Sequence, residues 1–206
     1  GHAEDAIQEQ QIPVRRIGMA DLEASVVDWD AFDWAKPQVL PVSDKKKLRA
    51  HQLEAVEAVT SGFATHDRGK LIMACGTGKT FTSLRLAEQL VGAGGSVLFL
   101  MPSISLLSQT LREWATEAEA PLAPLAVCSD RKATARSKAV NEDISAVDLA
   151  LPSTTNVAVL ESRLTQAFGE TDSMTVVFST YQSIDVVAQA QKQGDLPPFD
   201  LIIGST

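Results

Sequence analysis

One short stretch of the chain carries residue types that could do chemistry together. Residues 74–80 read ACGTGKT, and they end in a lysine followed by a hydroxyl side chain. In the pattern G-x-x-x-x-G-K-[ST], a tight turn points backbone N–H groups at phosphate oxygens, and side chains would obstruct that approach. We therefore expect a phosphate-binding turn whose backbone runs through Cys75, Gly76, Thr77 and Gly78.

The two residues that close this turn have separate expected roles. Lys79 supplies a positive charge for the β and γ phosphates of a nucleotide, and Thr80 offers a hydroxyl to Mg²⁺. One position departs from the pattern, because Met73 stands where its first glycine is expected. The alternative interpretation is a glycine-rich connection that binds nothing.

The flanking segments decide between these alternatives, since such a turn needs a strand before it and a helix after it. Residues 70–75 form a continuous apolar run, which is typical of a strand buried on both faces. After the turn, apolar residues recur at helical spacing up to Val91. Met73 then lies in or at the end of the strand, before the turn approaches a ligand, and the context favours the phosphate turn.

The same alternation continues along the chain. Further buried strands are expected at 96–101, 122–128, 174–180 and 199–204. A helix capped by Ser103 is expected between the first two, a short helix near 160–168, and another after 183. Upstream, an amphipathic helix should present an apolar stripe formed by Leu53, Val56, Val59 and Phe63. Strands that alternate with helices predict an α/β fold, a parallel sheet with helices on both faces.

Composition limits the class of protein. The 206 residues carry a formal net charge of −8, and 45% of them are apolar, which suits one main soluble domain. No apolar run approaches the length of a membrane span, and no secretory signal is visible, so a cytoplasmic location is expected. Cys75 and Cys128 suggest neither a disulfide framework nor a metal site.

Net acidity counts against a dedicated nucleic-acid-binding protein, because phosphate binding favours clustered basic residues. One basic cluster does occur, formed by Arg131, Lys132, Arg136 and Lys138. A solvated loop is favoured there over a phosphate contact. Residues 1–47 are expected to be a lead-in segment that packs Trp29, Phe32 and Trp34 on the domain.

Several motifs together resemble the superfamily 2 helicase-like ATPases. ACGTGKT is similar to their motif I, in which a methionine is common at the place of Met73. LRAHQLEAV, residues 48–56, resembles their upstream glutamine motif, and the resemblance implies that Gln52 reads the edge of adenine. It further implies a RecA-like P-loop NTPase fold over residues 48–206, with ATP and Mg²⁺ as cofactors.

Two later motifs resemble segments that contact DNA in that superfamily. PSISLLSQT, residues 102–110, is similar to motif Ia, which implies backbone contacts from Pro102, Ser103 and Gln109. FSTYQS, residues 178–183, is similar to a strand-end motif, which brings Ser179, Thr180, Tyr181 and Gln182 to the same groove. The resemblance implies duplex DNA as the partner.

Within the superfamily, the chain is most similar to the helicase-like part of type ISP restriction-modification enzymes. In those single-chain enzymes a nuclease precedes the motor and a methyltransferase follows it, and neither is apparent in these 206 residues. The family's acidic DEAH-type box is expected after the strand at 199–204, where the chain reads Gly204-Ser205-Thr206. The second RecA-like lobe is also absent.

These features predict the first motor lobe of an ATP-dependent DNA helicase or translocase linked to a restriction endonuclease, which binds nucleotide weakly when alone and does not turn it over. Two alternatives stay open. One is a kinase or NTPase of another P-loop class. A preference for adenine over guanine, which Gln52 predicts, would argue against it. The other is a non-catalytic interaction module, which MgATP should not stabilise.

Overall fold

The computed structural model describes residues 27–41, 44–128 and 153–205. The chain divides into two compact units, Gly1–Lys45 and Lys46–Thr206. The basic cluster at 131–138 lies outside the described residues. In the first unit, Trp29, Phe32 and Trp34 pack edge to face, with ring centroids 5.6 and 5.0 Å apart. Packing of these rings on the main domain remains a prediction.

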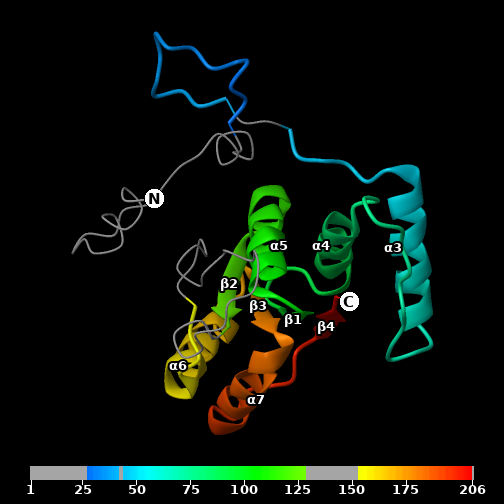
Figure 1. The fold of residues 1–206 in the computed structure, drawn as a ribbon, viewed down its shortest axis with the longest axis vertical. Helices are drawn as coiled ribbons and strands as arrows, with labels where there is room; N and C mark the ends of the chain where they lie inside the picture. The colour runs from blue at the N-terminus through cyan, green and yellow to red at the C-terminus, as the bar shows by residue number, and fades with distance from the viewer. Residues whose placement is uncertain (1–26, 42–43, 129–152, 206) are drawn as a thin grey trace, which may run out of the picture. The chain divides into compact units, whose positions relative to one another are not determined.

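The second unit is built on a parallel sheet (Figure 1). Its strands are β1 (Ser96–Met101), β2 (Leu122–Val127), β3 (Met174–Thr180) and β4 (Leu201–Gly204), in the spatial order β2-β3-β1-β4. All three pairings are parallel, and every residue of β1 and β3 is buried. The four strands form where the sequence predicts them, but burial along the whole strand is confirmed only for β1 and β3; β2 is buried at its last two residues, and β4 has no buried residue.

Helices cover both faces of this sheet, as predicted. On one face, α4 (Lys79–Leu90) and α5 (Ile104–Glu117) bury a cluster that includes Leu84, Trp114 and Phe178. On the other face, α6 (Val157–Phe168) and α7 (Ile184–Gln193) enclose a second cluster around Leu160 and Val177. The sheet is therefore a rigid platform, and the residues that follow its strands lie at one edge.

One predicted strand is wrong. Residues 70–75 form no strand among the described residues; the segment is extended and unpaired, and Ile72 is 82% exposed. A buried parallel strand needs a hydrogen-bonded neighbour and apolar cover on both faces. One edge of the sheet is β4, a four-residue strand with alternating exposure whose Ile202 is itself 60% exposed. Apolar composition alone did not supply either requirement.

The helix before this segment, α3 (Ala50–Phe63), forms where predicted but presents a different face. Leu53, expected in the apolar stripe, is 48% exposed, whereas Gln52 is 5% exposed. Val56 is buried as expected. The buried amide of Gln52 bears directly on the phosphate turn.

Candidate nucleotide-binding site

The predicted turn is formed by backbone that only glycine adopts readily. Gly76 and Gly78 have φ angles of 75° and 81°, in the left-handed region that other residues avoid. Gly78 is the N-cap of α4, so Lys79 and Thr80 begin the helix. The free N–H groups and the positive dipole end of α4 therefore face the turn, which is a favourable place for phosphate.

Helix α3 holds the turn through a single carbonyl. Gln52 Nε2 donates to Thr77 O at 3.0 Å, and His51 Nε2 lies 3.2 Å from the same oxygen. The Gln52 Oε1 accepts from the backbone N–H of Arg49 at 2.9 Å. Each amide atom has one remaining hydrogen-bonding position. Gln52 can therefore position the turn and still pair with an adenine edge, as the resemblance implied.

The side chains expected to meet the triphosphate lie at the turn. Lys79 Nζ donates to the carbonyl oxygens of Met73 and Ala74, each at 3.4 Å, and these long contacts leave the ammonium group easily redirected. Thr77 Oγ1 closes the turn by donating to Ala74 O at 2.7 Å. Among the described residues no hydrogen bond engages the Thr80 hydroxyl, which belongs to the first turn of α4.

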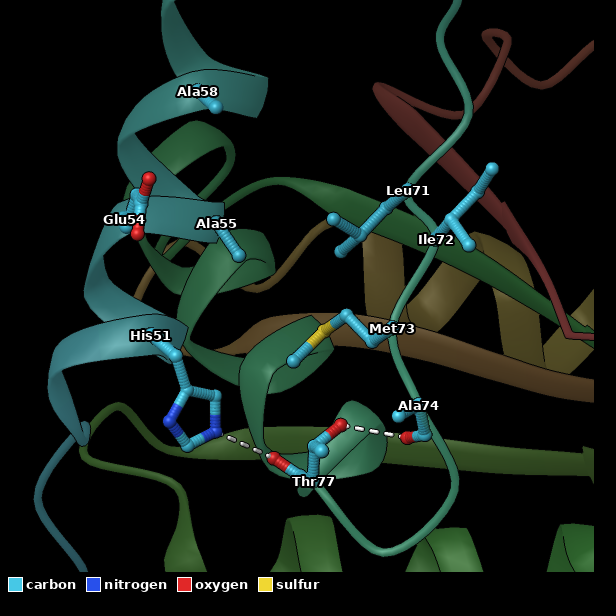
Figure 2. A pocket seen from close by; sticks show the side chains of 9 residues that line it. All are labelled: His51, Glu54, Ala55, Ala58, Leu71, Ile72, Met73, Ala74 and Thr77. Atoms are coloured by element: carbon cyan, nitrogen blue, oxygen red, sulfur yellow. Dashed lines mark hydrogen bonds between the residues drawn. The ribbon is translucent and has the colours of Figure 1, made fainter.

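A cavity beside the turn explains why a methionine can stand at position 73, where the motif has a glycine. This cavity, of about 350 Å³, lies between α3 and residues 71–77. Figure 2 shows Leu71 and Met73 directed toward α3, with Ile72 directed away. The side chain of Met73 thus faces α3 rather than the turn, and its backbone precedes the glycines. A residue larger than glycine is tolerated there, as the sequence suggested.

A second cavity, of about 310 Å³, also lies against the turn. Its size is at the lower end of the range for small-molecule sites. It is lined by the turn residues Gly76, Thr77 and Gly78, by Phe81 of α4 and Glu113 of α5, and by Lys46, Lys47, Arg49 and Gln52. Because Gln52 and the turn share this cavity, a nucleoside attached to turn-bound phosphates has room here.

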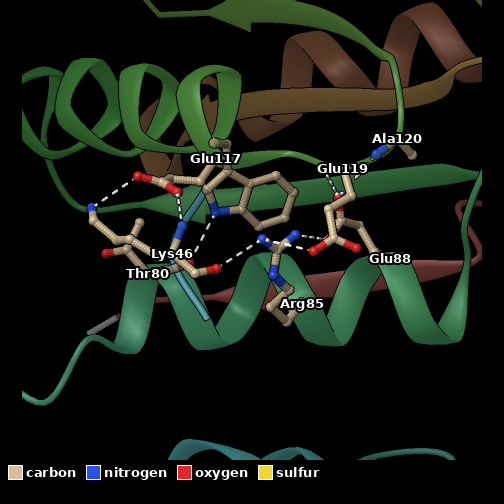
Figure 3. A network of polar contacts seen from close by, with 8 residues as sticks. Lys46, Thr80, Arg85, Glu88, Glu117, Glu119 and Ala120 are labelled. Carbon is tan, nitrogen blue, oxygen red and sulfur yellow. Dashed lines mark hydrogen bonds and ion pairs between the residues drawn. The ribbon is translucent and has the colours of Figure 1, made fainter. Parts of the chain in front are cut away.

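A polar network holds one wall of this second cavity in place (Figure 3). Glu117 of α5 accepts from the backbone N–H of Lys46 at 2.9 Å and pairs with its Nζ at 3.1 Å. Arg85 of α4 donates to Lys46 O at 3.3 Å and pairs with Glu88 and Glu119 at 2.6 and 3.1 Å. Both backbone groups of Lys46 are therefore bound by side chains of the domain.

Glu113 is the acid that lines this cavity. Burial raises the pKa of its carboxyl above the usual range; nearby Lys46 opposes this shift and nearby Glu117 adds to it. Sequence reasoning missed Glu113, Lys46 and Arg85, because their roles depend on how α4 and α5 cross. The only available signal was the position of Glu113 beside Trp114 on a predicted amphipathic helix.

We expect the ionised form of Glu113 to destabilise the fold. Its raised pKa means that the native state binds the proton more tightly than the unfolded chain. The penalty is therefore absent at low pH, appears as the pH rises through the unfolded pKa, and is complete above the folded pKa. Thermal unfolding should show Glu113→Gln more stable than the wild type at pH 7, with this gain disappearing toward about pH 4.

Glu117→Gln is the matched control for this prediction. The Glu117 carboxylate is engaged by Lys46 through its backbone and its ammonium group. Removal of that charge should lower the melting temperature at pH 7. A Glu113→Gln advantage that did not change with pH would contradict the assignment of the penalty to ionisation.

The residues expected to contact DNA follow neighbouring strands. Met101 of β1 pairs with Thr180 of β3, so Pro102 and Tyr181 emerge at the same edge of the sheet. Pro102 and Gln109 are exposed, and Ser103 caps α5 by accepting from Leu106 N at 3.3 Å. Pro102 and Ser103 follow β1 directly at that edge, whereas Gln109 lies further along, within α5.

Ser179 and Thr180 are placed differently. Both are buried, and their hydroxyls donate to Thr180 O and Ser183 Oγ, each at 3.1 Å. Tyr181 and Gln182 are exposed, and the Tyr181 hydroxyl donates across the end of β1 to Ser205 O at 3.0 Å. The buried pair thus shapes the turn that presents Tyr181.

The fold and the turn together define an α/β domain of the P-loop class, with a parallel sheet covered on both faces. The chain belongs to the family described as type III restriction enzyme, res subunit, whose family model matches residues 45–204. A family model for a restriction endonuclease matches residues 1–39. A comparison with curated proteins gives no significant match.

Two solved structures are similar to this chain. The ATP-dependent type ISP restriction-modification enzyme LlaBIII bound to DNA is 40% identical, with a TM-score of 0.79, over 98% of this chain and 13% of that one. A nuclease-deletion mutant of the type ISP enzyme LlaGI in complex with a DNA substrate mimic is 44% identical, with a TM-score of 0.64. That match covers 77% of this chain and 15% of the LlaGI chain. This chain thus spans a small part of the length of either relative.

Two features are absent among the described residues. No helix among them is long and apolar enough to cross a membrane. They also contain no group of three or more histidine, cysteine or acidic side chains that could hold a metal ion.

Proposed function

We propose that this chain is the ATP-binding first motor lobe of a DNA-dependent ATPase, a helicase or duplex translocase that serves a restriction-modification enzyme. The observation that carries the proposal is the glycine turn at the start of α4, held by Gln52 beside a nucleoside-sized cavity. The family match and the likeness to two type ISP enzymes support it.

The residues of the site fit MgATP. A side chain added at Gly76 would meet open space, so the turn leaves room for phosphate oxygens. Lys79 would hold the β and γ phosphates, Thr80 would ligate Mg²⁺, and Gln52 would pair with adenine. Bound Mg²⁺ neutralises charge on the phosphates. The backbone N–H groups from Cys75 to Gly78 orient them toward the helix.

For DNA, we propose that Pro102, Ser103, Gln109 and Tyr181 contact the backbone of the duplex. Pro102 and Tyr181 follow paired strands at one edge of the sheet, which supports this, as do the DNA-bound relatives. Ser179 and Thr180 act indirectly, since their buried hydroxyls hold the turn that carries Tyr181. The match of residues 1–39 to a restriction endonuclease supports an adjoining nuclease module.

We further propose that the 206-residue chain binds ATP without hydrolysing it. Hydrolysis by P-loop enzymes uses a carboxylate at the end of a neighbouring strand, and an arginine supplied to the γ phosphate. The residues that follow β4 in this chain are Ser205 and Thr206, which carry no charge. Since this chain spans only 13% and 15% of the two relatives, we propose that turnover requires groups from outside these 206 residues.

Replacing Lys79 tests this proposal. Lys79→Ala should weaken MgATP binding to the chain by at least about tenfold, because one charge-assisted contact to phosphate is lost. Isothermal titration calorimetry measures the affinity, and hydrolysis should be undetectable for both proteins. Equal affinities of the wild type and Lys79→Ala for MgATP would contradict the assignment of this turn to phosphate binding. Hydrolysis by the wild type that Lys79→Ala abolishes would contradict the proposal that the chain does not turn over ATP. Stabilisation by MgGTP equal to that by MgATP would favour another P-loop class.

A further inference from the structure

A carboxyl group without a partner lies in the wall of the proposed nucleoside cavity. Glu113 lines this cavity, yet no hydrogen bond or ion pair engages it among residues 44–128 and the other described segments. The neighbouring acids are engaged: Glu117 binds Lys46, and Glu88 binds Arg85. Glu113 is therefore available to a ligand.

The position of this carboxyl group is set by the helix that carries it. The adjacent residue, Trp114, is fully buried, and its indole N–H donates to Thr80 O at 3.1 Å. Thr80 belongs to the first turn of α4, directly after Lys79. The backbone at Glu113 is thus fixed relative to the phosphate turn. Lys46, which also lines this cavity, has both of its backbone groups bound by Glu117 and Arg85.

Charge determines which end of a nucleotide Glu113 can meet. The other charged residues that line the cavity are basic: Lys46, Lys47 and Arg49. A carboxylate repels phosphate, so the triphosphate belongs at Lys79 and the glycine turn, and the nucleoside lies toward Glu113. An ionised carboxyl group can only accept hydrogen bonds. Its partner must therefore be a donor, either the exocyclic amine of adenine or a ribose hydroxyl.

We propose that Glu113 is a specificity-determining residue of the nucleotide site, which accepts a hydrogen bond from a donor on the nucleoside. This inference rests on the proposed function, because it requires a nucleotide bound at the turn. Burial raises the pKa of Glu113, as expected for a charge whose partner arrives with the ligand. Gln52 alone reads one edge of the base; Glu113 adds a second requirement that the ligand carry a donor.

The test compares MgATP with two analogues that each lack one donor, on the 206-residue chain. Inosine triphosphate replaces the 6-amino group by oxygen, and 2′-deoxyATP lacks one ribose hydroxyl. The wild type should bind one of them about tenfold more weakly than ATP, the effect of one charge-assisted hydrogen bond. Glu113→Gln should reduce that ratio to about threefold, because its amide oxygen is a neutral and weaker acceptor than the carboxylate, while the contact of Gln52 with the base is kept in both proteins. Fluorescence titration measures each affinity.

Two controls separate the possible outcomes. Glu57→Gln, at an exposed acid of α3 outside the cavity, makes the same change of charge and should keep the wild-type ratios. If Glu113→Gln reduces the preference for ATP over inosine triphosphate, the donor is the amine of the base. If it reduces the preference for ATP over 2′-deoxyATP, the donor is the ribose hydroxyl. Unchanged ratios in Glu113→Gln overturn the inference but leave the proposed function intact if Lys79→Ala still weakens binding. If Lys79→Ala binds as the wild type does, the proposed function fails and this inference fails with it.

Discussion

Replacing Trp114 by alanine should lower the free energy of unfolding by about 3 to 5 kcal/mol, the usual cost of removing a buried large aromatic side chain. The indole is 0% exposed, and its ring centroid lies 5.4 Å from that of Phe99 and 5.6 Å from that of Phe178. It joins α5 to the centre of the sheet. The total free energy of unfolding of such a domain is only about 5 to 15 kcal/mol, so the Trp114→Ala variant should be marginally folded.

A second contact makes Trp114 matter to the nucleotide site as well. Its Nε1 donates to Thr80 O, in the first turn of α4. Trp114→Phe keeps most of the apolar area but loses this donor, and it should cost about 1 to 2 kcal/mol for the hydrogen bond and the smaller ring. Urea denaturation, monitored by a circular dichroism signal that does not depend on tryptophan, measures the free energy of unfolding of both variants. Equal stability of Trp114→Ala and Trp114→Phe would contradict a packing role for the indole.

Replacing Gly78 by alanine should disrupt the turn in two ways. At a φ angle of 81°, any side chain adds strain of about 1 to 2 kcal/mol. The new methyl group would also collide with the Nε2 of Gln52. The amide must then move, and it would lose its bonds to Thr77 O and the Arg49 N–H, at about 1 kcal/mol each. The sum is about 3 to 4 kcal/mol, with nucleotide affinity reduced at least tenfold.

Gly76→Ala is the matched control. Its φ angle of 75° brings similar strain, but the added methyl group meets nothing within 4 Å. Gly76→Ala should therefore lower the free energy of unfolding only by the backbone strain, about 1 to 2 kcal/mol. In Gln52→Ala the amide is absent, so adding Gly78→Ala to that variant should cost no more than Gly76→Ala does. A double-mutant cycle in urea measures this coupling, and simple additivity of Gln52→Ala and Gly78→Ala would show that the collision is not relieved through Gln52.

Much of the fold could be predicted from the sequence because local patterns coincide with tertiary demands. The apolar runs of β1 and β3 are buried along their whole length, and the stripe of α5 buries Leu107, Leu111 and Trp114 as expected. Each of these elements has a sheet neighbour or a helix that completes its burial. Where such a neighbour is missing, at residues 70–75, the same kind of apolar run forms no strand.

The glycine turn was also predictable, since its chemistry is local. Positive φ angles at Gly76 and Gly78 follow from residue type, and Lys79 and Thr80 follow from their places at the helix start. The part played by Gln52 was predictable only through family resemblance. Its burial, and the exposure of Leu53 beside it, depend on which face of α3 meets the turn.

The sequence by itself therefore determined the phosphate turn, the parallel sheet with helices on both faces, and the motifs that lead to the family. Only the tertiary structure decided that Glu113 lines the nucleoside cavity, that Lys46 is held from both sides, and that Ser179 and Thr180 are buried. The reason is physical. Short-range backbone preferences and hydrophobic periodicity act over a few residues, whereas these contacts depend on how α4 and α5 cross and on the register of neighbouring strands.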